Sequence, residues 1–206
     1  MADPGYTPSD RVTGVVLAAG LGRRMGRPKA LLPWAGGTLL SHAAGILRKA
    51  GIDSLAVVGA DLVGPVGPIR TVVNTHPEQG LSTSLATAVG WLMKTAPGQA
   101  AMICLVDQPF VTVDDIRRMV RAYAARPPAV RIVRPWYHDR PGHPVVLHPD
   151  VFPDILALTG DVGIGRMATA RDDVLNVVIE VGERPDPGFD IDTEEDYAQA
   201  LAWAGS

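Results

Sequence analysis

Short apolar runs alternate with amphipathic segments along this chain. Apolar runs bounded by glycine, proline or polar residues predict buried strands, and they lie at 15–19, 55–59, 71–74, 101–106, 130–133, 145–147 and 174–181. Apolar residues at helical spacing predict helices at 39–50, 113–123, 151–158 and 194–203, with a further helix that opens near residue 82. Because strands that alternate with helices favour a parallel sheet, we expect an α/β fold.

The composition fits one globular domain. The chain has 206 residues, of which 47% are hydrophobic, and its formal net charge is −3. No basic face dominates and no apolar run approaches a membrane span, which argues against nucleic-acid and membrane partners. The single cysteine, Cys104, lies in an apolar run and suits a reducing compartment. We expect a cytoplasmic protein with a loose N-terminus at 1–10 and one domain over 11–206.

A glycine-rich loop follows the first predicted strand. It contains Gly20, Gly22 and Gly26, where backbone N–H groups can approach an anion closely. Arg24 and Lys29 add a planar fork and a point charge, the two kinds of cation that hold polyphosphate. The glycine spacing is neither the dinucleotide-binding fingerprint nor a Walker loop. On spacing alone, a plain glycine-rich turn with solvated cations explains this loop about as well as a phosphate cradle does.

Acidic residues mark two further places. Asp107 follows the apolar run 101–106, which places a carboxylate at the carboxyl edge of the sheet, where open α/β sheets bind ligands. Asp190 and Asp192 alternate, so we expect both side chains on one side of a strand end. Two carboxylates on one side indicate a metal or another cation between them. An alternative for Asp107 is a hydrogen bond within its own loop.

Two other stretches carry weaker signals. Gly80 and the hydroxyl residues after it open a helix, which can receive an anion or a ribose, or can be an ordinary serine- or threonine-capped helix. Trp136 and Tyr137 could stack on a flat ligand, although surface packing explains them as well. The histidines at 138, 143 and 148 fit no helix face and have no cysteine partners, which argues against a zinc site.

Five motifs in order resemble one family. They are Leu-Ala-Ala-Gly-x-Gly-x-Arg-Met-Gly with Pro-Lys (17–29), Gly-Leu-Ser-x-Ser-Leu (80–85), Leu-x-Asp-x-Pro (105–109), Gly-His-Pro-Val (142–145) and Asp-Ile-Asp-Thr (190–193). Together they are similar to the MobA-like nucleotidyltransferases, which include the molybdenum-cofactor cytidylyl- and guanylyltransferases. The resemblance implies one three-layer α/β/α domain of the GT-A-like nucleotidyltransferase fold, with a mostly parallel, Rossmann-like sheet.

The resemblance also implies roles for individual residues. Catalytic roles fall to Arg24 and Lys29, and metal binding, by Mg²⁺ with Mn²⁺ as a substitute, falls to Asp107, Asp190 and Asp192. The residues implied to bind the nucleotide are Leu17, Ala18, Ala19, Gly20, Gly22, Asn74, Gly80, Ser82 and Ser84. Those implied to bind the acceptor are Gly142, His143, Asp161 and Gly163. One extra residue precedes Arg166 relative to the family pattern, which weakens its assignment as a phosphate contact.

The function implied is nucleotidyl transfer. A phosphate of the acceptor, expected to be molybdopterin, attacks the α-phosphorus of CTP, or less favourably GTP, and expels pyrophosphate. A molybdoenzyme or a second copy of the chain is a possible protein partner. The alternatives are another phosphorylated acceptor, a NAD(P)H-dependent reductase of the nicotine-blue type, and a nucleotide sensor without turnover.

Overall fold

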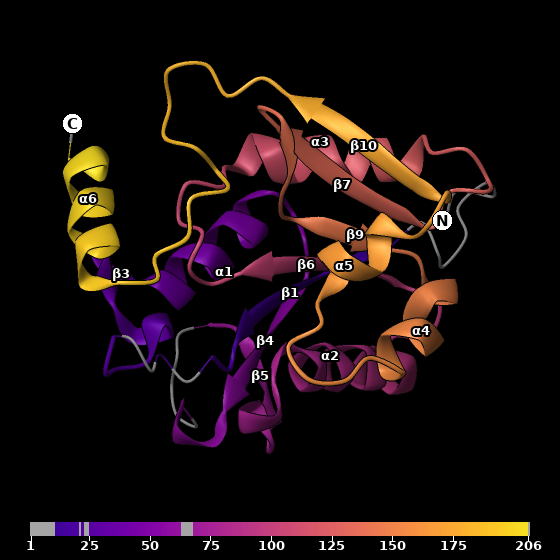
Figure 1. Ribbon diagram of the computed structural model, residues 1–206, viewed down its shortest axis with the longest axis horizontal. Coiled ribbons are helices and arrows are strands. Elements are labelled where there is room, and N and C mark those ends of the chain that lie inside the picture. The colour runs from indigo at the N-terminus through magenta and orange to yellow at the C-terminus, as the bar shows by residue number, and fades with distance from the viewer. Residues whose placement is uncertain (1–10, 21, 23–24, 63–67, 206) are drawn as a thin grey trace.

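A central sheet with helices on both faces forms the protein. The computed structural model describes residues 11–20, 22, 25–62 and 68–205. The strand order is β10-β7-β9-β6-β1-β4-β5, with β8 paired to β7 (Figure 1). All pairings along this order are parallel except those of β9, which runs antiparallel to β6 and β7. The prediction of a mostly parallel α/β sheet is therefore confirmed.

The strands are β1 (Val12–Ala18), β2 (Pro33–Trp34), β3 (Gly37–Thr38), β4 (Ser54–Gly59), β5 (Arg70–Asn74), β6 (Ala100–Leu105), β7 (Ile132–Tyr137), β8 (Arg140–Pro141), β9 (Val145–Leu147) and β10 (Val174–Ile179). The α-helices are α1 (Leu39–Lys49), α2 (Leu81–Thr95), α3 (Val113–Ala124), α4 (Phe152–Leu156), α5 (Ile164–Thr169) and α6 (Glu194–Ala204). Single 3-10 turns occur at Lys29–Leu31, Ala60–Leu62, Pro77–Gln79 and Pro149–Val151.

Two apolar clusters, one on each face of the sheet, make up the core. One cluster joins α1, α3 and α6 to the sheet through residues such as Leu47, Met119 and Tyr197. The other joins α2, α4 and α5 through residues such as Leu85 and Phe152. In Figure 1, α2 and α4 accordingly lie side by side at the lower right, while α6 lies at the left. These are the three layers that the resemblance implied.

Local sequence explains where three of the helices begin. Thr38, Thr112 and Thr193 each cap a helix and each form a reciprocal capping box with the residue three positions on. An acid three positions after Thr112 and after Thr193 is the local sequence pattern of a capping box, and both acids form one here. The expected serine or threonine cap of α2 is wrong, because Gly80 occupies the cap position without a side-chain hydrogen bond.

Other local expectations differ from the structure. Asp190 and Asp192 lie in the loop between β10 and α6, not at a strand end, so the alternation argument for their shared direction is wrong. The short helix α5 has no counterpart among the predicted helices. The N-terminal segment 1–10 lies outside the described residues. Across the part of the chain that the structure describes, we find no helix with the length and hydropathy needed to span a membrane.

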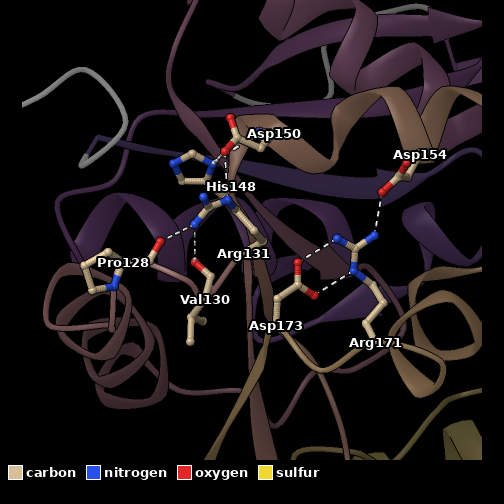
Figure 2. A network of polar contacts seen from close by, with 8 residues as sticks. All are labelled: Pro128, Val130, Arg131, His148, Asp150, Asp154, Arg171 and Asp173. Atoms are coloured by element: carbon tan, nitrogen blue, oxygen red, sulfur yellow. Dashed lines mark hydrogen bonds and ion pairs between the residues drawn. The ribbon is translucent and has the colours of Figure 1, made fainter.

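A network of ion pairs lies at the amino-terminal edge of the sheet. Arg171 binds both carboxylate oxygens of Asp173, at 2.7 and 2.6 Å, and also reaches Asp154 of α4 (Figure 2). Beside it, Arg131 pairs with Asp150 at 2.7 Å. Arg131 and Asp173 precede the parallel strands β7 and β10, so the network lies at the edge from which these strands start. It holds α4 and the start of β10 together.

Candidate nucleotide site

A cavity of about 540 Å³ opens at the opposite, carboxyl edge of the sheet. The ends of β1 and β6 form its floor, and the start of α2 and the segment before α6 form its walls. The lining residues are Leu17, Ala18, Ala19, Gly20, Gly22, Lys29, Ala30, Pro77, Glu78, Gly80, Leu81, Ser84, Leu105, Val106, Asp107, Asp161 and Asp192. Of the predicted nucleotide-binding residues, only Asn74 and Ser82 are missing from this set.

One lysine lies between two predicted metal ligands. Lys29 Nζ is 2.7 Å from Asp107 Oδ2 and 2.6 Å from Asp192 Oδ1. The side chain of Lys29 is only 17% exposed. Burial by itself lowers the pKa of Lys29, but the charge of Asp107 and the hydrogen bonds to both carboxylates outweigh it and raise the pKa. The ammonium therefore stays charged at neutral pH and neutralises part of the acidic cluster.

Backbone and side-chain hydrogen bonds join the two acid-bearing segments. Ile191 N–H donates to the carbonyl oxygen of Asp107 at 3.0 Å. Gln108 Nε2 donates to Asp190 Oδ1 at 2.9 Å, and burial together with the nearby charge of Asp107 raises the pKa of Asp190. Asp190 is not among the cavity's lining residues. Asp107 and Asp192 are thus presented to the cavity, while Asp190 is turned to Gln108.

A cluster of three aromatic rings packs beside these two segments. Phe110 follows Asp107 by three positions, and its ring centroid lies 6.2 Å from that of Phe189, the residue before Asp190. Trp203 of α6 packs against both rings, with centroids 5.8 and 5.0 Å away. Ring packing of this kind fixes orientation as well as burying apolar surface. No local motif in the sequence signals this cluster, because its members come from three distant segments.

The start of α2 is fixed to a loop from the second half of the chain. Gly80 has a φ of +103°, and a Cβ there would lie 2.4 Å from the carbonyl carbon of Gly160 and 2.7 Å from Asp161 Oδ1. Ser82 N–H donates to the carbonyl oxygen of Gly160 at 3.1 Å. Glycine at position 80 is therefore required by this close approach, which brings Asp161 to the cavity wall.

Asn74 and Ser82 are both 2% exposed and lie behind the cavity wall. Asn74 Nδ2 donates to the hydroxyl oxygens of Thr83 and Ser84, at 2.9 and 3.0 Å, and its Oδ1 accepts from His76 N–H at 2.9 Å. Asn74 thus joins the end of β5 to the first turn of α2. Its contacts orient Ser84, which does line the cavity.

Of the residues implied to bind the acceptor, only Asp161 lines the cavity. Gly142 lies against the ring of Tyr137, where a Cβ would come within 2.6 Å of it. Burial lowers the pKa of His143 to about 4, against the opposing charge of Asp107, so its imidazole is neutral at pH 7. Gly163 packs against Leu81, and Arg166 is exposed on α5. Gly142, His143 and Gly163 therefore lie outside the cavity lining.

Stacking of Tyr137 on a ligand is excluded by its burial. Its side chain is fully buried in the core, and its hydroxyl donates to the carbonyl oxygen of His143 at 2.9 Å. Trp136 is partly buried, with the guanidinium of Arg134 lying 5.6 Å from its ring centroid. Arg24, a predicted catalytic residue, lies outside the described residues.

Two of the three predicted metal ligands, Asp107 and Asp192, line the cavity. Within the described residues, no group of three or more His, Cys, Asp or Glu side chains is arranged to hold a metal ion. The set of Asp107, Asp190 and Asp192 is thus not assembled as three ligands. Asp107 and Asp192 do converge on one cation, the Lys29 ammonium, and two carboxylates suit magnesium, which takes its other ligands from phosphate and water.

Six cavity residues were absent from the sequence prediction: Ala30, Pro77, Glu78, Leu81, Leu105 and Val106. Leu105 and Val106 immediately precede Asp107, so the strand-end argument could have included them. Pro77 and Glu78 belong to a 3-10 turn that closes the wall before α2. Their position depends on the tertiary packing of that turn.

This chain is similar to one known protein domain and to curated proteins of two kinds. Residues 14–174 match the MobA-like NTP transferase domain. A probable molybdenum cofactor guanylyltransferase of Mycobacterium tuberculosis (strain ATCC 25618 / H37Rv) is 38% identical over 130 residues, covering 61% of this chain and 62% of that protein. The nicotine blue oxidoreductase of Paenarthrobacter nicotinovorans is 31% identical over 213 residues, covering 96% of this chain and 100% of that protein.

A solved structure is also similar to this chain. The manganese complex of Rv0371C from Mycobacterium tuberculosis H37Rv has a TM-score of 0.74 and 30% identity, and the match covers 93% of this chain and 98% of that one. The family match spans β1 to the start of β10 and includes the glycine loop, Lys29 and Asp107. This chain belongs to the MobA-like NTP transferase family and is a nucleotidyltransferase of that type.

Proposed function

We propose that this protein transfers CMP from CTP to a phosphorylated acceptor of the molybdopterin type and releases pyrophosphate. The observation that carries the proposal is the convergence of Lys29, Asp107 and Asp192 beside the glycine loop, at the wall of a cavity of about 540 Å³. The similarity to a probable molybdenum cofactor guanylyltransferase supports the choice of acceptor.

The residues present divide the chemistry between them. The glycine loop offers backbone N–H groups to the phosphates, and Lys29 supplies positive charge where charge develops on the α-phosphate. Asp107 and Asp192 would hold Mg²⁺, which neutralises phosphate charge when it is bound. The acceptor phosphate is already anionic, so no general base is required and the protein's main task is to align the two phosphates.

GTP is the second candidate nucleotide, because the relative from Mycobacterium tuberculosis is named a guanylyltransferase. The Gly80-Leu81-Ser82-x-Ser84-Leu85 segment resembles the cytidylyl branch and supports CTP. Pyrophosphate release should be measured with each of the four triphosphates, magnesium and molybdopterin. We expect release with CTP, and release with GTP alone would reassign the base. No release with any triphosphate, together with no binding in calorimetry, would refute the proposal.

A reductase activity is the second candidate function, favoured by the similarity to nicotine blue oxidoreductase over 96% of this chain. Hydride transfer has no use for two carboxylates that converge on a cation beside the cavity, which supports nucleotidyl transfer instead. Oxidation of NADH or NADPH in the presence of a dye acceptor distinguishes the two. Turnover of a nicotinamide cofactor without pyrophosphate release would favour the reductase.

A further inference from the structure

We propose that the Lys29 ammonium fills the cation site between Asp107 and Asp192 while the pocket is empty, and excludes a divalent metal until a polyphosphate takes over the ammonium. This inference rests on the proposed function, because it assumes a polyphosphate substrate. It means that metal and nucleotide bind as a unit, and that free metal binds weakly to the protein alone.

The two contacts of Lys29 carry the first step. Its Nζ lies 2.7 Å from Asp107 Oδ2 and 2.6 Å from Asp192 Oδ1, so it is in contact with an oxygen of each acid. Magnesium binds carboxylate oxygens at about 2.0–2.1 Å. A metal that bridged the same two oxygens would overlap with the ammonium and would also be repelled by its charge. Metal and Lys29 therefore compete for one place.

Hydrogen bonds that do not involve Lys29 also hold the two acid-bearing segments in place. Ile191 N–H donates to the carbonyl oxygen of Asp107 at 3.0 Å, and Asp192 N–H donates to Asp196 Oδ2 at 3.0 Å. The first of these bonds joins the two acid-bearing segments, and the bond from Gln108 to Asp190 adds a second connection between them. None of these bonds involves Lys29, so we expect the two carboxylates to stay close enough to accept a metal when the ammonium leaves.

The cavity supplies somewhere for the ammonium to go. Lys29 lines the same cavity as Gly20 and Gly22, where the proposed function places the phosphates. Without polyphosphate, the ammonium would lose its ion pairs with two carboxylates and gain only hydrogen bonds to water. With polyphosphate present, it exchanges carboxylate oxygens for phosphate oxygens, which are equally good partners for a charged donor. Polyphosphate thus makes the exchange favourable and opens the site to metal.

The first test measures Mn²⁺ binding by electron paramagnetic resonance to the folded protein without nucleotide. Lys29→Met should bind Mn²⁺ at least tenfold more tightly than the wild type, whereas Lys29→Arg, which keeps the charge, should stay weak. Arg27→Met is the matched control. Arg27 pairs with Glu194 at 3.0 Å and is 48% exposed, so its loss removes a nearby charge that contacts neither acid. We expect its affinity within threefold of the wild type.

Several outcomes would overturn the inference. Equal Mn²⁺ affinity in the wild type and Lys29→Met would do so, and so would tight binding by Lys29→Arg. Adding Asp192→Asn to Lys29→Met must abolish the gain, since a gain that survives places the metal elsewhere. Because no nucleotide is present, these titrations decide the role of Lys29 at the acids even if the proposed reaction is wrong.

The exchange itself has a separate readout. The Nζ resonance of Lys29, identified by its absence in Lys29→Met, should shift when metal-free CTP is added to the wild type. An unchanged resonance at saturating CTP would refute the exchange. Absence of any CTP binding in calorimetry would instead count against the proposed function, so the two failures are distinguishable.

Discussion

Two places in this fold hold one cation between two aspartates, at opposite edges of the same sheet. At the amino-terminal edge, Arg171 lies between Asp154 and Asp173 (Figure 2). At the carboxyl edge, Lys29 lies between Asp107 and Asp192. The charges are alike, but the type of cation and its surroundings differ.

The difference indicates that the ion pairs of Arg171 are structural, whereas those of Lys29 can be exchanged for other contacts. The planar guanidinium of Arg171 binds both oxygens of Asp173, a geometry that fixes direction as well as distance. The ammonium of Lys29 is a point charge that touches one oxygen of each acid and faces a cavity. We infer that the arginine cluster serves stability, whereas the lysine cluster serves the reaction. Substitutions at the two clusters should therefore separate activity from stability.

The largest effect is expected from Asp107→Asn. Loss of this carboxylate removes one of the two acids that would hold the metal, so the rate should fall about a thousandfold, or about 4 kcal/mol. Asp190→Asn is the matched control, because Asp190 is bonded to Gln108 outside the cavity lining, and its loss should cost less than tenfold. Single-turnover rates at saturating CTP check both. Equal losses would restore Asp190 to the metal site.

The second-largest effect is expected from Lys29→Ala, which should lower the saturated rate about a hundredfold, or about 3 kcal/mol. The reason is that a charge aimed at the α-phosphate matters most as negative charge develops there. Lys29→Arg should not restore the full rate, since a planar fork differs from a compact ammonium. Dissociation constants for CTP, measured beside the rates, identify the role. Weaker affinity with an unchanged saturated rate would make Lys29 a binding residue only.

Arg171→Ala should act on stability instead. It removes charge-assisted hydrogen bonds that are partly exposed, so the free energy of unfolding should fall by about 1–2 kcal/mol. The saturated rate of the folded enzyme should stay within about twofold of the wild type, because the cluster lies at the edge opposite the cavity. Urea unfolding and single-turnover rates measure the two quantities. A large loss of rate at full folding would contradict the assignment of this cluster to stability.

The smallest effect concerns pH. The hydrogen bonds from Arg171 hold the pKa of Asp173 below its usual value near 3.8. A carboxyl whose folded pKa is depressed adds stability above its unfolded pKa and loses that contribution as the pH falls through the folded value. The stability difference between wild type and Asp173→Asn should thus be constant above about pH 5 and shrink below about pH 4. A stability difference that grew as the pH fell would contradict a lowered pKa for Asp173.

Local patterns predicted much of the framework. Apolar runs located the main strands, and Thr112 and Thr193 marked two helix starts, because strand burial and helix caps depend on residues close in sequence. The same reasoning failed at Gly80, where contact with Gly160 replaces a side-chain cap. It also failed for Tyr137, whose place in the core follows from the packing of β7 and not from its neighbours in sequence.

By itself, the sequence determined the alternation of strands and helices, the glycine loop after β1 and the acid after β6, since each depends on residues within a few positions. Only the tertiary structure decided which cation meets which acid. Lys29 is 78 positions from Asp107 and 163 positions from Asp192, and no local periodicity relates them. Their meeting depends on the strand order of the sheet and on aromatic packing behind the two acid-bearing segments, which are sums of many long-range contacts.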